Sequence, residues 1–364
     1  MDSATTLERP AAAAADATHR EPVRTADAAV RTVNLALQGG GAHGAFAWGV
    51  LDRLLEDERI AFEGVSATSA GAMNAAVLAY GLTEGGRHGA RKALANFWRR
   101  VSHGALLSPL QPTAWDHLTH DHSLKHNPAF LVFDVITRLL SPYQFNPGNY
   151  HPLRGILEEC VDFERLRHGS AVKLFLSATN VRSGKVKIFE NAELSVDAVL
   201  ASGCLPFLFQ AVEIDGEAYW DGGYMGNPAM FPLIYGCQSR DVVIVHINPI
   251  EREEVPRDAR DIMNRINEIS FNSSLMREMR AIAFVTRLID DGALCDGSVK
   301  RMLIHSIEGD GFMRGLGVAS KLNPDWEFLT HLHDVGWERA DGWLREHFDR
   351  LGQDSTVDIR SRYL

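Results

Sequence analysis

The sequence of 364 residues predicts an α/β fold in three layers, α/β/α, with a mainly parallel central sheet and a helical C-terminal extension. Two observations carry this prediction. A short apolar run that ends in small residues is followed by an apolar pattern of helical spacing, at residues 33–58 and again at residues 65–80. Apolar runs of strand length recur at residues 173–178 and 242–247. Strands that alternate with helices indicate a parallel sheet covered on both faces.

The first strand is predicted at residues 33–37, an apolar run that ends at Gln38 and three glycines. A helix is expected from about Gly44 to Glu58, because apolar side chains recur there every three or four residues. These side chains are Phe46, Val50, Leu51, Leu54 and Leu55.

A second strand is predicted at residues 65–68, followed by an alanine-rich helix to about Tyr80. Its small residues would let this helix pack closely on the sheet. Farther on, Asp215-Gly216 separates two short runs within residues 211–220 and predicts a β-hairpin. The second strand of this hairpin leads directly into Asp221.

We expect three regions along the chain. Residues 1–30 include an alanine run flanked by acidic residues and are expected to form a disordered tail. Residues 33–250 hold the alternating strands and helices, with an insertion at about 106–150 that is rich in proline, histidine and aromatic residues. Residues 251–364 are expected to form the helical extension.

The composition excludes several classes of protein. With 45% apolar and 23% charged residues, the chain has the balance of a globular protein. The formal net charge of −10 and the lack of a long basic run argue against nucleic acid as a partner. No stretch is long and apolar enough to span a bilayer, and the N-terminus lacks the order of a secretory signal. The four cysteines form no CxxC pair, which favours a reducing compartment, so a cytoplasmic protein is predicted.

A glycine-rich loop joins the first strand to the first helix. Glycine lets the backbone approach a ligand closely, and N–H groups at a helix N-terminus attract negative charge. The loop therefore fits an oxyanion hole or, because it matches G-x-G-x-x-G, a dinucleotide site. A tight turn without function is the third interpretation. The loop consists of Gly39, Gly40, Gly41, Ala42, His43 and Gly44.

A serine lies at the second junction between a strand and a helix, which is the context of a nucleophile elbow. A sharp turn there would lift the Ser69 hydroxyl above the sheet, and small neighbours are needed because the backbone turns tightly. Ala67 stands where the usual pattern has glycine. A small-residue turn without function is the alternative. The motif is Ala67, Thr68, Ser69, Ala70 and Gly71.

The third motif, Asp221-Gly222-Gly223, follows the hairpin. Its glycines allow the strand end to turn and present the carboxylate, although such a sequence is often only a turn. An acyl hydrolase needs an oxyanion site, a nucleophile and a base. Because all three motifs lie at element boundaries, we predict that Ser69 is the nucleophile and Asp221 its base. Burial would make this carboxylate a stronger base than its usual pKa of about 4 implies.

These motifs resemble those of the patatin-like phospholipase family. The resemblance rests on the glycine-rich loop, on residues 68–74, on the Asp-Gly-Gly motif and on residues 201–207, and it covers about residues 33–250. It implies a Ser–Asp dyad without a histidine. No cofactor and no metal are expected. It also implies hydrolysis of a lipid or other acyl ester through an acyl-enzyme, with oxyanion stabilisation by amides around Gly40, Gly41 and Ala42. His43 stands where the family often has Arg or Lys.

Several alternatives stay open at this point. One of four histidines could complete a triad in the order Ser, acid, His. A polar cluster in the insertion could bind a metal, although a solvated loop is favoured. The triad candidates are His246, His305, His331 and His333, and the cluster comprises Asp116, His117, His120, Asp121, His122 and His126.

Residues 130–140 form an apolar segment within the insertion. A core or cap helix is favoured, and the alternative is a lid or interfacial patch that admits lipid tails. Transient association of the protein with a membrane surface is also possible. Two other functions compete with hydrolysis: a non-catalytic lipid- or protein-binding module on the same fold, and a nucleotide-binding oxidoreductase. The sequence leaves the head group, the acyl length and the oligomeric state open.

Overall fold

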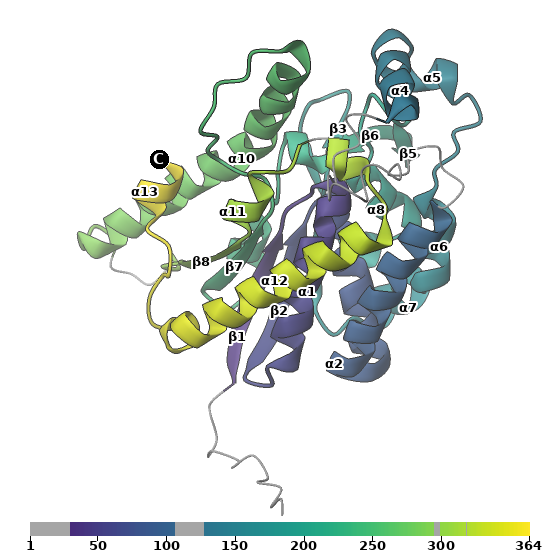
Figure 1. Cartoon of the computed structure of the whole chain (residues 1–364). Coiled ribbons are helices and arrows are strands. Elements are labelled where there is room, and N and C mark those ends of the chain that lie inside the picture. Colours follow the sequence, from purple (N-terminus) through teal and green to yellow (C-terminus); the bar gives the residue numbers. More distant parts are fainter. Residues whose placement is uncertain (1–29, 106–126, 295–298, 318) are drawn as a thin grey trace, which may run out of the picture.

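The computed structural model describes residues 30–105, 127–294, 299–317 and 319–364 (Figure 1). The predicted N-terminal tail lies outside the described residues except for Val30. The histidine-rich cluster of the insertion also lies outside them, because residues 106–126 are not described.

A central sheet of eight strands organises the fold (Figure 1). The strand order is β5-β6-β3-β2-β1-β7-β8, and β4 pairs with β3. The five strands β3, β2, β1, β7 and β8 are parallel to their neighbours in this set. The strands β4, β5 and β6 pair antiparallel. The sheet is therefore mainly parallel, and the predicted fold class is confirmed. The strands are β1 (Arg31–Leu37), β2 (Ile60–Ala67), β3 (Lys173–Asn180), β4 (Val186–Glu190), β5 (Val212–Ile214), β6 (Glu217–Asp221), β7 (Asp241–His246) and β8 (Leu303–Glu308).

Helices connect and cover these strands. The helices are α1 (Gly44–Glu56), α2 (Ala70–Gly104), α4 (Pro128–Leu139), α5 (Pro142–Phe145), α6 (Leu153–Cys160), α7 (Phe163–Gly169), α8 (Val196–Ser202), α9 (Phe231–Gly236), α10 (Ala259–Asp290), α11 (Asp310–Met313), α12 (Trp326–His347) and α13 (Ile359–Tyr363). Short 3₁₀ turns are η1 (Gly41–His43), η3 (Asn191–Glu193), η4 (Gly222–Tyr224), η5 (Ala319–Leu322) and η6 (Phe348–Arg350).

The two faces of the sheet carry separate apolar cores. Val33, Leu35 and Leu37 of β1 belong to the core that contains the buried faces of α1, α2 and α12. Ala36, between them in sequence, belongs to the core that α9 and α10 cover. Successive side chains of a strand point to opposite faces, so one strand contributes to both layers.

The helix after β2 is longer than predicted. It was expected to end near Tyr80, but α2 extends to Gly104 and departs from helical geometry at Gly85 and Gly86. A Cβ on Gly81 would lie 2.5 Å from the Cα of Ala90, so the chain turns back and its two halves pack together. The second half stays helical because it buries apolar side chains, among them Leu94, Phe97 and Trp98.

The predicted hairpin is present as β5 and β6. Asp215 and Gly216 both have positive φ angles, 52° and 79°, which the two central residues of a tight hairpin turn require. The register pairs Ile214 with Glu217 and brings Asp221 beside Ala178 of β3. The hairpin therefore extends the sheet beyond β3.

The C-terminal region is largely helical, as predicted, and it also adds β8 to the sheet beside β7. Sequence reasoning missed this strand because His305 and Ser306 interrupt its apolar run. The buried imidazole of His305 is accommodated by Asp241, whose Oδ1 lies 2.9 Å from Nε2. Helix α12 packs against α1 at very short range, since a Cβ on Gly336 would lie 2.1 Å from the carbonyl oxygen of Phe46. In Figure 1, α12 crosses next to α1.

The described part of the insertion begins with α4, which Asn127 caps by accepting hydrogen bonds from the Ala129 and Phe130 amides. The chain then passes through α5, α6 and α7 to β3. Across the described residues, no helix combines the length and the apolar character needed to cross a membrane.

Candidate active site

Ser69 lies in the sharp turn between β2 and α2. Its φ and ψ are 56° and −124°, a region that residues with a side chain rarely adopt. The Ser69 N–H donates to Oγ of Ser202 (2.9 Å), and the carbonyl of Thr68 accepts from the Gly71 N–H (2.9 Å). Gly71 has no room for a side chain, since a Cβ there would lie 2.5 Å from the Leu37 carbonyl oxygen. The turn therefore has the backbone strain expected of a nucleophile elbow.

The residues around this serine hold the turn in place. Ala67 is the buried last residue of β2, and the Thr68 hydroxyl donates to the Gly226 carbonyl (2.6 Å). Ala70 begins α2, and a Cβ on Gly44 would lie 2.7 Å from its Cβ. The N-termini of α1 and α2 therefore approach each other closely, and their positive ends favour negative charge at this point.

Asp221 is fully buried at the end of β6. Its Oδ1 accepts a hydrogen bond from the Gly223 N–H (2.7 Å), and its backbone N–H donates to the Cys204 carbonyl (2.7 Å). A side chain at Gly222 would collide with β3, because its Cβ would lie 2.1 Å from the Ser177 carbonyl oxygen. The two glycines thus let the strand end turn inward and keep the carboxylate inside.

Burial raises the pKa of Asp221 to about 7. The Gly223 amide, the Ser69 hydroxyl and the charge of Lys321 act in the opposite direction, toward a lower pKa. The segment of Gly203 and Cys204 brings the two side chains together: a Cβ on Gly203 would lie 3.6 Å from the Ser69 Oγ, and the carbonyl of the next residue, Cys204, accepts the Asp221 N–H. Oδ2 of Asp221 makes no hydrogen bond to the described residues.

The glycine-rich loop lies directly against this serine. A Cβ on Gly39 would come within 2.6 Å of the Ser69 Cβ. Gly41 has a positive φ of 59°, and a Cβ there would lie 2.4 Å from the Lys321 carbonyl oxygen. The loop can approach Ser69 and the Lys321 backbone this closely only because Gly39 and Gly41 carry no side chain.

The amides of the loop are not equivalent. The Gly39 N–H donates to Oδ1 of Asn227 (2.8 Å), so it is already engaged. The His43 N–H bonds the Gly40 carbonyl, and the Gly44 N–H bonds carbonyls of the same 3₁₀ turn. The N–H groups of Gly40, Gly41 and Ala42 make no hydrogen bond to the described residues. These three amides are the remaining candidates for an oxyanion site.

A family model described as patatin-like phospholipase matches residues 35–234, which is more than half of the chain. The chain belongs to the patatin-like phospholipase family. Membership supports hydrolysis of lipid acyl groups. No curated protein matches the chain.

Solved structures similar to this patatin-like chain include VipD from Legionella pneumophila, with 15% identity and a TM-score of 0.42 over 91% of this chain and 72% of that one. ExoU from the type III secretion system of Pseudomonas aeruginosa, in complex with SpcU, matches at 15% identity and a TM-score of 0.37, over 89% of this chain. A second ExoU–SpcU structure matches at 16% identity and a TM-score of 0.34, over 92% of this chain. This chain spans only 53% and 58% of those two ExoU chains.

The sequence analysis did not predict four polar residues of this patatin-like site. Ser202 and Asn227 bond the Ser69 and Gly39 amides. Nδ2 of Asn248 donates to the Gly39 carbonyl (2.7 Å), and Lys321 Nζ donates to Asn248 Oδ1 (2.7 Å). Ser202 lies in the stretch that resembles the family, but nothing in the local sequence marks the other three. They reach the loop from segments distant in sequence.

Lys321 supplies the positive charge near the loop, and His43 does not. Burial lowers the pKa of His43 well below its ordinary value, and the charges of Lys321 and Arg252 lower it further. The neutral imidazole has its Nε2 2.8 Å from Oγ of Ser320. Burial lowers the pKa of Lys321 to about 8, so this side chain is largely protonated at neutral pH.

The histidines considered for a triad have other partners. His305 contacts Asp241 at the beginning of β7, the end of the strand away from Ser69. His333 lies 2.9 Å from Asp334 and 3.3 Å from Asp52. The rings of His331 and His246 pack near Phe312 and Tyr363. These contacts favour the arrangement without a histidine.

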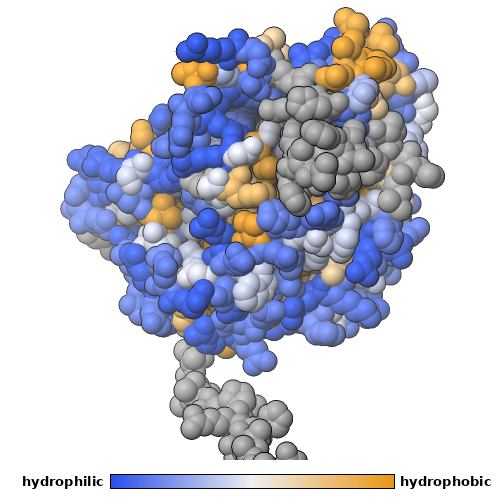
Figure 2. Space-filling model, in the orientation of Figure 1, coloured by the Kyte–Doolittle hydropathy of each residue, from blue (hydrophilic) through white to orange (hydrophobic). Residues whose placement is uncertain are grey.

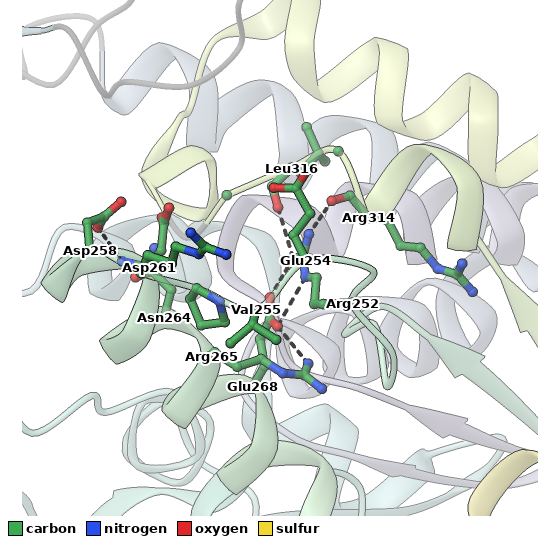
Figure 3. A pocket seen from close by; sticks show the side chains of 14 residues that line it. Arg252, Glu254, Val255, Asp258, Asp261, Asn264, Arg265, Glu268, Arg314 and Leu316 are labelled. Atoms are coloured by element: carbon green, nitrogen blue, oxygen red, sulfur yellow. Dashed lines mark hydrogen bonds and ion pairs between the residues drawn. The ribbon is translucent and has the colours of Figure 1, made fainter.

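A pocket of about 770 Å³ opens near the beginning of α10, and none of the predicted site residues lines it (Figure 3). Glu268 lines this pocket and pairs with Arg252 (2.5 Å) and Arg265 (3.0 Å). Arg252 also donates to the carbonyls of Arg314 and Leu316. Arg252, Arg265 and Glu268 thus pair with one another, and Ser69 does not line this pocket.

Proposed function

We propose that the protein is a serine lipid acyl hydrolase of the phospholipase A or esterase type, with Ser69 as nucleophile and Asp221 as base. The observation that carries the proposal is the strained Ser69 turn beside a buried carboxylate with a pKa of about 7. Three unengaged amides of the glycine-rich loop, which packs against this serine at Gly39, support it further.

In the first half-reaction, Ser69 Oγ attacks the ester carbonyl carbon, and its proton passes to Asp221. The carbonyl oxygen becomes an oxyanion, which the amides of Gly40, Gly41 and Ala42 would stabilise. Collapse of this intermediate breaks the ester bond. The departing alcohol takes the proton from Asp221, and the acyl group stays on Ser69.

In the second half-reaction, water attacks the acyl-enzyme while Asp221 accepts its proton. The same amides stabilise the second oxyanion, and the fatty acid leaves as Ser69 Oγ recovers a proton. A carboxylate with a pKa of about 7 suits both roles, because it exchanges protons readily near neutral pH.

The proposal extends to partners and location. The substrate is a lipid or another acyl ester, and association with a membrane surface is transient. A cytoplasmic location and the division into a tail, a catalytic domain and a helical extension rest on the sequence alone.

A fluorophosphonate probe and a short-chain aryl ester test this function on wild type, Ser69→Ala and Asp221→Asn. We expect wild type to be labelled and to turn over, Ser69→Ala to lose labelling, and both variants to lose turnover. A wild type that neither labels nor hydrolyses any ester, in solution or on lipid vesicles, would favour the non-catalytic binding module instead.

A further inference from the structure

Helix α4 carries a row of exposed aliphatic side chains. Leu131, Val132, Val135 and Leu139 are 40%, 60%, 53% and 76% exposed. Their spacing places them within about 100° of arc on one side of the helix. Figure 2 shows hydrophobic residues gathered over α4 at the upper right. A contiguous apolar surface of this kind usually marks an interaction site.

The same helix has no net charge. Its only ionisable residues, Asp134 and Arg138, pair with each other through two contacts of 3.1 Å. The aliphatic row therefore presents neither a cationic nor an anionic surface. A partner that fits this face is itself apolar and does not depend on charge.

The opposite side of α4 packs against η5, which in turn contacts the glycine-rich loop. Phe130 is buried against Ala319 and Leu322 of η5. The intervening residues of η5 touch the glycine-rich loop, Ser320 through His43 (2.8 Å) and Lys321 through its backbone beside Gly41. One short element thus separates the exposed row from the candidate oxyanion amides.

We propose that α4 docks the enzyme on a lipid surface of zwitterionic phospholipid, with its aliphatic row inserted among the acyl chains. The proposal rests on the proposed lipid hydrolase function, because the substrate would lie in the surface that α4 contacts. The neutral helix and the net charge of −10 give no attraction to anionic lipid. Apolar burial drives the binding, so salt has little effect on it.

Flotation with phosphatidylcholine vesicles tests the docking directly. We expect Val132→Asp/Val135→Asp to weaken vesicle binding by roughly tenfold or more, because two inserted side chains become charged. Both positions are exposed, so turnover of a soluble aryl ester should stay at the wild-type level and report intact folding. Phe284→Asp is the matched control. This residue is also exposed (62%) but lies near the far end of α10, and its substitution should leave binding unchanged.

The outcomes separate the docking from the chemistry. Unchanged vesicle binding in the α4 variant overturns the proposal, as does a loss of binding when salt is raised. Concentration-dependent dimers that the α4 substitutions abolish, without any effect on vesicles, also overturn it, because the row would then bind a second copy. A wild type that binds vesicles through α4 but hydrolyses no ester supports the docking and rejects the proposed function.

Discussion

The pH dependence of acyl transfer follows from the burial of Asp221. Since burial raises its pKa to about 7, about a tenth of the enzyme carries the carboxylate base at pH 6, half at pH 7 and nine-tenths at pH 8. We expect kcat/KM for a soluble aryl ester to rise about tenfold per pH unit below pH 7 and to level off above pH 8. An ordinary exposed aspartate would give a profile that is flat from pH 5 upward.

Lys321→Met sharpens this test. The charge of Lys321 acts to lower the pKa of Asp221, so its removal should move the rising limb of the profile to higher pH. The limb should shift to higher pH, keep its slope, and still level off into a plateau. Lys187→Met removes a lysine that pairs with Glu193 on the surface and should leave the limb in place.

The measurement is kcat/KM from pH 5 to 9 at constant ionic strength, with circular dichroism at each pH to confirm the fold. A wild-type inflection near pH 4, or a limb that moves to lower pH in Lys321→Met, would refute the assignment of the limb to Asp221. A limb that moves equally in both lysine variants would show that the shift reports net charge and not the neighbourhood of Asp221.

Three further predictions concern Asp221, Ser69 and Gly39. Because its folded pKa is raised from 3.8 to about 7, Asp221 contributes stability below pH 4 that is lost as the pH rises through 7. In urea denaturation at pH 8, Asp221→Asn should therefore be more stable than wild type, by at most about 4 kcal/mol. Equal stabilities at pH 8 would contradict the burial of an ionised group. Ser69→Gly should raise the free energy of unfolding by about 1 kcal/mol by relieving the strain at φ 56°, whereas Ser69→Ala, which keeps the Cβ, should not. Gly39→Ala should lower kcat/KM by about 100-fold or more, because its Cβ would lie 2.6 Å from that of Ser69, while Gly155→Ala, which meets no atom within 4 Å, should have no effect.

Local patterns in the sequence predicted the central part of the fold. The strands at residues 33–37 and 173–178 lie within β1 and β3, and the predicted hairpin is present with its turn at Asp215 and Gly216. Strand periodicity and turn chemistry depend on neighbours in the chain, so they are legible without a structure. The roles of Ser69 and Asp221 also came from local motifs, and they stay predictions until they are tested.

Long-range contacts decided the rest. The sequence by itself marked the glycine-rich loop as a backbone that approaches a ligand, but only the tertiary structure decided which amides remain unengaged, because Asn227 reaches the Gly39 N–H across the site. Likewise, β8 can bury His305 in the sheet because Asp241 contacts its ring, and Lys321 reaches the loop from η5. Hydrogen bonds of this kind depend on where distant segments meet, which no local pattern encodes.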